Sequence, residues 1–267
     1  MTMDPVDRRT LLGSLASAGI LAVSPLRAAD DSTWTLVRSQ LFGDRMVADD
    51  GAYATLVAPV RAEDAALVPI DIHLAVPAGD ARTVTSITLV VDENPSPLVA
   101  RFAFPDQLKT FDMSTRVRVN SYSYVRAIAE TSDGVLHMSK SFVKAAGGCS
   151  APAAKDPAQA QADVGKMRFR VFTTTGRDEA QLQIRHPNYS GMQMNQVTRL
   201  YTPAWFIEHL RVKQGDKLLF TLDGGISLSE DPTFRFSYRA DGDTVSIEAE
   251  DSNGSEYSKV FPAAGGA

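Results

Sequence analysis

The chain has 267 residues, of which 44% are hydrophobic and 22% charged, and its formal net charge is −5. This composition excludes a disordered or fibrous chain, and the acidic balance excludes the basic footprint of a nucleic-acid-binding protein. One cysteine and four scattered histidines leave too few ligands for a protein metal site. We therefore expect no metal, no cofactor and no metalloenzyme.

The first 29 residues contain the three parts of an export signal. Arg8 and Arg9 precede an apolar stretch of small residues, and Ala28 and Ala29 follow it. The apolar stretch is too short for a comfortable membrane span. Paired arginines at this place resemble the twin-arginine route of bacteria. We expect residues 1–29 to be removed, which leaves a periplasmic protein with no membrane anchor.

Residues 30–144 have the pattern of a β domain. Residues 83–91 are rich in β-branched side chains and end in a turn cluster at 92–97. Residues 116–119 alternate between arginine and valine, and Asp133-Gly134 predicts a tight turn. No helix of ten or more residues is expected here. The length suits an immunoglobulin-like sandwich.

Residues 166–267 repeat this pattern. Apolar residues 167, 169 and 171 alternate with Arg168 and Arg170, so one strand face is apolar and the other basic. The one helix-like patch is 204–209. The fold class is therefore all-β, with two immunoglobulin-like sandwich domains joined by a flexible linker.

Residues 145–165 form the expected linker, and eight of these 21 residues are alanine. Such a segment buries too little apolar area to order itself, so we expect a flexible arm that exposes Cys149, the only thiol of the chain. An unpaired thiol in an oxidising compartment readily forms disulfides, so its presence indicates a use. Gly147 and Gly148 lack Cβ atoms and would let the arm enter a narrow channel. Cys149 is thus predicted to be the covalent attachment point of a carried group.

Two other functions remain open. An enzyme with Cys149 as nucleophile would need a nearby base; His137 and His186 are candidates, but no sequence feature places either ring beside the thiol. A scaffold of two sandwich domains would bind partners without using the thiol.

Short motifs make the chain resemble a fusion of the two carrier subunits of the bacterial thiosulfate-oxidising Sox system. The first half is similar to SoxY through Leu41–Asp44, Asn94–Pro97 and Gly147-Gly148-Cys149. The second half is similar to SoxZ through His186-Pro187, Asp231-Pro232 and Asp251–Gly254. The order of these motifs along the chain makes the resemblance specific.

The resemblance implies a carrier without catalysis of its own, which holds a sulfur-containing intermediate on Cys149. The implied partners are a Sox-type cytochrome, a hydrolase and a sulfur dehydrogenase. Fused versions also resemble a branch associated with quinoprotein alcohol dehydrogenases, so the alternative function is a periplasmic scaffold for such a system. In the family pattern, glycine and a nearby free C-terminus follow the cysteine. Here Ser150-Ala151-Pro152 and a second domain follow, so the arm must enter any partner as a doubled strand.

Overall fold

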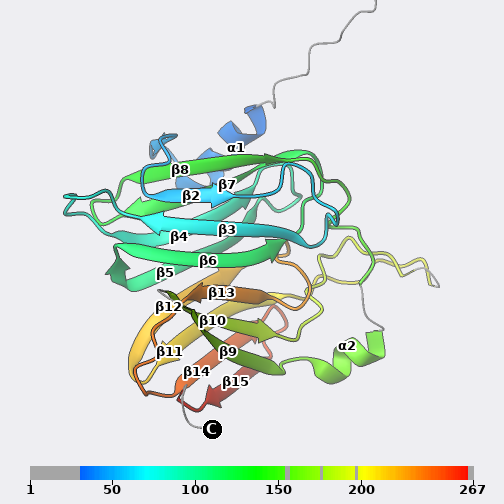
Figure 1. Cartoon of the computed structure of the whole chain (residues 1–267). Coiled ribbons are helices and arrows are strands. Elements are labelled where there is room, and N and C mark those ends of the chain that lie inside the picture. Colours follow the sequence, from blue (N-terminus) through cyan, green and yellow to red (C-terminus); the bar gives the residue numbers. More distant parts are fainter. Residues whose placement is uncertain (1–30, 154–156, 175–176, 196–197, 264–267) are drawn as a thin grey trace, which may run out of the picture. The chain divides into compact units, whose positions relative to one another are not determined.

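The computed structural model describes residues 31–153, 157–174, 177–195 and 198–263, and the predicted signal at 1–29 lies outside them. From Asp31 onward the chain forms one compact unit. It is an all-β structure with two sheets (Figure 1), which confirms the predicted fold class. No helix in the described part of the chain combines the length and apolar character needed to cross a bilayer.

Each sheet takes strands from both halves of the chain. In hydrogen-bonded order, the nine-stranded sheet contains β1 (Val47–Ala48), β8 (Leu136–Val143), β7 (Ser123–Thr131), β4 (Val84–Val91), β5 (Leu98–Leu108), β12 (Lys217–Gly224), β11 (Ile207–Gln214), β14 (Val245–Asp251) and β15 (Glu256–Phe261). The six-stranded sheet contains β2 (Ala54–Val57), β3 (Val68–Ala75), β6 (Thr110–Val117), β13 (Thr233–Ser237), β10 (Arg177–Ile184) and β9 (Met167–Thr174).

The two halves meet edge to edge in both sheets. In one sheet β5 pairs with β12, which places Phe102 opposite Leu222. In the other β6 pairs with β13, which places Met113 opposite Phe236. One apolar core, which includes Phe102 and Phe220, runs through both halves. The sequence predicted two domains joined by a linker and left open whether they pack on each other; ladder hydrogen bonds and shared apolar burial join the two halves.

A helix that the sequence analysis did not expect covers part of the larger sheet. Helix α1 (Ser32–Phe42) packs Trp34 and Val37 against residues of β4, β7 and β8. It lies beside β7 and β8 in Figure 1. This cover explains why seven of the eight side chains of β4 are buried, since the strand faces the core on one side and α1 on the other.

Two further differences concern local structure. Residues 207–214 form strand β11, so the predicted helix-like patch at 204–209 is wrong. Within the predicted linker, α2 (Pro157–Asp163) is a short helix, and residues 145–149 are packed against the two halves.

Candidate functional site

The Gly-Gly-Cys segment lies in a seat formed by both halves of the chain. The amide of Gly147 donates to the carbonyl of Asn120 over 2.8 Å, and that of Gly148 donates to the carbonyl of Val119 over 3.0 Å. From the second half, the hydroxyl of Ser190 donates to the carbonyl of Cys149. The arm is therefore docked at the junction of the two halves.

Glycine is required at 147 and at 148 for two different structural reasons. Gly147 has a φ of +80°, a conformation that side chains other than glycine rarely adopt. A Cβ on Gly148 would lie 2.1 Å from the carbonyl oxygen of Ala65 and 2.7 Å from that of Val119. Neither backbone oxygen can move aside easily, so the docked arm requires glycine at 148.

Cys149 is fully buried, with 0% of its surface exposed. The prediction of an exposed thiol on a free tether is thus wrong for this structure. The neighbours of Cys149 along the chain, Gly-Gly and Ala-Pro, build no core and so gave no sign of this burial. The cover comes from segments far away in sequence, around residues 65, 119 and 190.

Burial raises the pKa of the Cys149 thiol to about 11, although the positive charge of Arg118 acts in the opposite direction. The thiol makes no hydrogen bond to any residue that the structure describes. At neutral pH it is therefore protonated, and a thiol is a far weaker nucleophile than a thiolate.

The charged side chain of Arg118 hydrogen-bonds directly to the arm. Its Nη1 donates to the carbonyl of Gly148 over 3.1 Å, and its Nη2 donates to the carbonyl of Asn188 over 3.2 Å. The side chain is 2% exposed, and this burial lowers the pKa of the guanidinium. Arg118 thus links the arm to a loop of the second half.

Asn94 fixes the segment on which the arm rests. Its amide nitrogen donates to the carbonyl of Arg118 over 2.7 Å and to the Ser227 hydroxyl over 2.9 Å. Its amide oxygen accepts from the backbone amide of Asn120 over 2.8 Å. The Asn-Pro motif is therefore part of a buried network that joins the halves beneath the arm, in addition to its place in a turn.

The histidines considered as bases have other partners. His137 pairs with Asp50, with 2.8 Å between Nδ1 and a carboxylate oxygen. His186 is buried, its Nδ1 lies 2.8 Å from the amide oxygen of Asn188, and burial lowers its pKa. Neither ring hydrogen-bonds to the thiol, so the geometry does not bring a base to Cys149.

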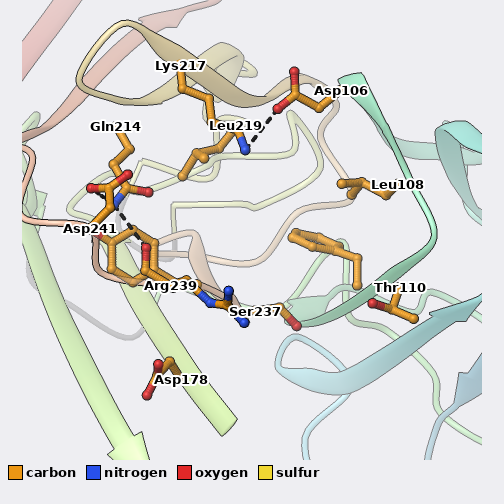
Figure 2. A pocket seen from close by; sticks show the side chains of 12 residues that line it. Asp106, Leu108, Thr110, Asp178, Gln214, Lys217, Leu219, Ser237, Arg239 and Asp241 are labelled. Carbon is orange, nitrogen blue, oxygen red and sulfur yellow. Dashed lines mark hydrogen bonds and ion pairs between the residues drawn. The ribbon is translucent and has the colours of Figure 1, made fainter.

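The cavity shown in Figure 2 lies away from the arm. It has a volume of about 610 Å³ and is lined from β5, β6, β10, β11, β12, β13 and the segment after β13. Lys217 and Asp106 are paired at 3.0 Å on one side. It adjoins Thr110 at the start of β6, whereas the arm lies beyond Val117 at the other end. An eight-residue strand separates them by roughly 24 Å, so this cavity cannot hold a group bound to Cys149 in the docked state.

Sequence reasoning found Cys149, Gly147 and Gly148 and missed the residues that hold them. Arg118 belongs to the arginine–valine alternation of residues 116–119, which does not reveal that its side chain is buried just beyond the end of β6. Asn188 and Ser190 directly follow the His186-Pro187 motif of the SoxZ-like half. This motif was the one sequence feature that could have drawn attention to them.

Comparisons with known families agree with this architecture. Residues 38–149 match the model of the sulfur oxidation protein SoxY, and residues 172–262 match that of the sulphur oxidation protein SoxZ. The SoxY match ends at Cys149. A search of curated proteins gives no significant match.

Solved structures give weaker likenesses. The sulfur carrier protein SoxY from Chlorobium limicola f thiosulfatophilum is 24% identical and covers 43% of this chain and 97% of its own, with a TM-score of 0.36. Two variants of the superoxide reductase neelaredoxin from Ignicoccus hospitalis are 15% and 16% identical. They cover 34% and 35% of this chain and 78% and 82% of their own, with TM-scores of 0.29 and 0.27. These scores are too low to carry an argument.

The two family matches and the β fold define a carrier-type protein of sulfur oxidation. More particularly, a SoxY-family domain and a SoxZ-family domain lie on one chain, which is the composition of a fused SoxYZ sulfur carrier.

Proposed function

We propose that this protein is a non-catalytic periplasmic carrier that holds a sulfur-containing intermediate covalently on Cys149. The observation that carries the proposal is the coincidence of three features at one residue. Cys149 is the only cysteine of the chain, it follows the two glycines of the arm, and the SoxY-family match ends at it.

The chemistry of loading is an oxidation. The thiol loses its proton, a bond forms between Sγ and the outer sulfur of thiosulfate, and two electrons leave. The product is Cys149–S–S–SO₃⁻, and the electrons pass to a haem protein partner. Hydrolysis of the terminal S–S bond by water then releases sulfate and leaves a persulfide on Cys149. The protonated, base-free thiol supports the idea that partner enzymes supply these steps.

Exchange with a partner requires the arm to leave its seat. Four hydrogen bonds, from Gly147, Gly148, Ser190 and Arg118, hold the docked segment. At about 1 kcal/mol net for each bond, undocking costs about 4 kcal/mol and exposes the thiol in roughly one molecule in a thousand. Such an equilibrium protects the empty thiol and still permits transfer.

The test is the intact mass of the mature protein after incubation with thiosulfate and an oxidising haem partner. We expect the mass of one thiosulfate-derived group to be added and to be removed by dithiothreitol. Cys149→Ser should abolish the addition. Ser150→Ala, a change on the same arm, serves as the matched control and should retain it. A mass increase that persists in Cys149→Ser would contradict the proposal.

A further inference from the structure

Arg118 is a buried cation that has no carboxylate partner among the residues that the structure describes. Its guanidinium donates to the backbone carbonyls of Gly148 and Asn188, and its Nε has no hydrogen-bond partner in the same part of the chain. Burial of a charge without an opposite charge is costly. The same chain shows the usual solution at Arg126, whose fully buried guanidinium lies 2.7 Å from the carboxylate of Asp92.

A cavity of about 340 Å³ adjoins Arg118 and the arm. Its wall includes Ala151 and Pro152, just beyond the thiol, together with Arg116 and Arg185. This volume is about ten times that of a water molecule in the liquid, which is enough for a sulfonate group and several waters.

Three carboxylates, those of Asp64, Glu230 and Asp231, line this cavity together with the three arginines. The arginines differ in how directly a carboxylate contacts them. Asp231 pairs with Arg185, whereas Arg116 donates to neutral oxygens, the carbonyl of Asp231 and the hydroxyl of Thr233. The negative charges of Glu230 and Asp64 act on Arg118 through space.

We propose that Arg118, assisted by Arg116, receives the anionic end of a cargo group on Cys149 when the arm is docked. This inference rests on the proposed carrier function and on its thiosulfate-derived cargo, Cys149–S–S–SO₃⁻, whose free end is a sulfonate. Arg118 is then a positioning residue that responds to the charge of the cargo. An anionic cargo supplies a negative charge in direct contact with the Arg118 guanidinium, so the loaded arm docks more firmly than the empty arm.

The thiol itself does not supply that counter-ion at neutral pH. Because burial raises the pKa of Cys149 to about 11, the docked thiol is uncharged. A sulfonate remains charged throughout the physiological pH range, and charge-assisted hydrogen bonds to a guanidinium are about twice as strong as neutral ones. The loaded arm is therefore expected to dock more firmly, because its sulfonate is charged and the thiol of the empty arm is not.

The experiment compares three adducts of similar size on Cys149, the only cysteine of the chain. Alkyl methanethiosulfonates transfer a 2-sulfonatoethylthio, 2-hydroxyethylthio or 2-aminoethylthio group to the thiolate and release methanesulfinate. The adducts carry charges of −1, 0 and +1. The readout is the rate at which dithiothreitol removes each adduct in the full-length mature protein, divided by the rate in urea-unfolded protein.

We expect the sulfonate adduct to be removed at least tenfold more slowly than the hydroxyl adduct, and the ammonium adduct to be removed fastest. Arg118→Gln should eliminate this order, and Arg118→Lys should retain part of it. Arg211→Gln, a change of an exposed arginine on β11, is the control and should leave the order unchanged.

Arg116→Gln provides a second test should Arg118→Gln fail to fold, and it should reduce the difference between the sulfonate and hydroxyl adducts at least threefold. Equal protection of the three adducts in the unsubstituted protein would overturn the proposal. An order that persists in both Arg118→Gln and Arg116→Gln would also overturn it. No partner enzyme takes part, so this result is independent of whether thiosulfate loading occurs.

Discussion

At the scale of single residues, burial of Cys149 has a measurable consequence for its reactivity. An exposed cysteine thiol has a pKa near 9, and docking raises the pKa of Cys149 to about 11. Docking disfavours the thiolate, so the free energy of docking is fully present below pH 9. It is lost progressively as the pH rises from about 9 to about 11.

The alkylation rate of Cys149 should therefore keep rising about tenfold per pH unit beyond pH 9, up to pH 10, because both the thiolate fraction and the undocked fraction increase. Urea-unfolded protein should level off above pH 9, with only about a twofold rise from pH 9 to pH 10, because its thiol is already half ionised at pH 9. Gly148→Ala, whose Cβ would lie 2.1 Å from the carbonyl oxygen of Ala65, should react faster and show the same early plateau. The measurement is the rate of iodoacetamide addition from pH 7 to 10. A plateau near pH 9 in the folded, unsubstituted protein would contradict a docked thiol.

The residues of the arm show how far sequence reasoning reaches. Gly147, Gly148 and Cys149 could be identified from the sequence because two glycines stand directly before the one cysteine of the chain, in an alanine-rich segment. Arg118 could not, because the alternation of residues 116–119 does not reveal that its side chain is buried just beyond the end of β6. The inward turn depends on Ser227 and Asn94, which contact Arg118 through its backbone. Such contacts between distant segments have no signature in the local pattern.

At the scale of elements, α1 is held to the larger sheet by a charged as well as an apolar contact. The guanidinium of Arg126 in β7 lies 4.5 Å from the ring centroid of Trp34 and binds the carboxylates of Asp31 and Asp92. The β pattern of residues 30–144 led to the expectation of no long helix, and the spacing of Trp34, Val37 and Leu41, which suits one helix face, was not recognised. The apolar run Leu89–Val91 at the end of β4 also fits a strand that is covered on both faces.

Arg126→Met should lower the free energy of unfolding by about 3–5 kcal/mol, because it leaves the buried carboxylate of Asp92 without a partner. Arg101→Met is the matched control, since the Arg101 side chain is 52% exposed beside Glu130, and it should cost less than about 1 kcal/mol. Urea unfolding followed by circular dichroism gives both values. The double variant Arg126→Met/Asp92→Asn should recover part of the loss, because no buried charge remains. Equal losses in Arg126→Met and Arg101→Met would show that the buried pair of Arg126 and Asp92 stabilises the fold no more than an exposed pair does.

At the scale of the whole molecule, the two family domains share sheets and core. Phe102 on β5 contacts Phe220 on β12 and Phe234 on β13, with ring centroids 6.2 and 6.1 Å apart. The sequence correctly predicted that both halves consist of β-strands. Which edge strand of one half pairs with which edge strand of the other depends on the order of the strands within each sheet. Periodicity within a strand does not contain that information. The shared core implies that the halves unfold together.

The chain provides one tryptophan in each half, Trp34 and Trp205, to test this cooperativity. In Trp34→Phe and in Trp205→Phe, the fluorescence of the remaining tryptophan should report the same urea midpoint as circular dichroism. Phe102→Ala, added to each background, should lower the free energy of unfolding by about 3–5 kcal/mol at both tryptophans. Val260→Ala, at a 65% exposed position, is the control and should shift neither signal. If Phe102→Ala moved only the Trp34 transition, the two domains would be separate folding units. The seat of Cys149 would then join two bodies that unfold independently.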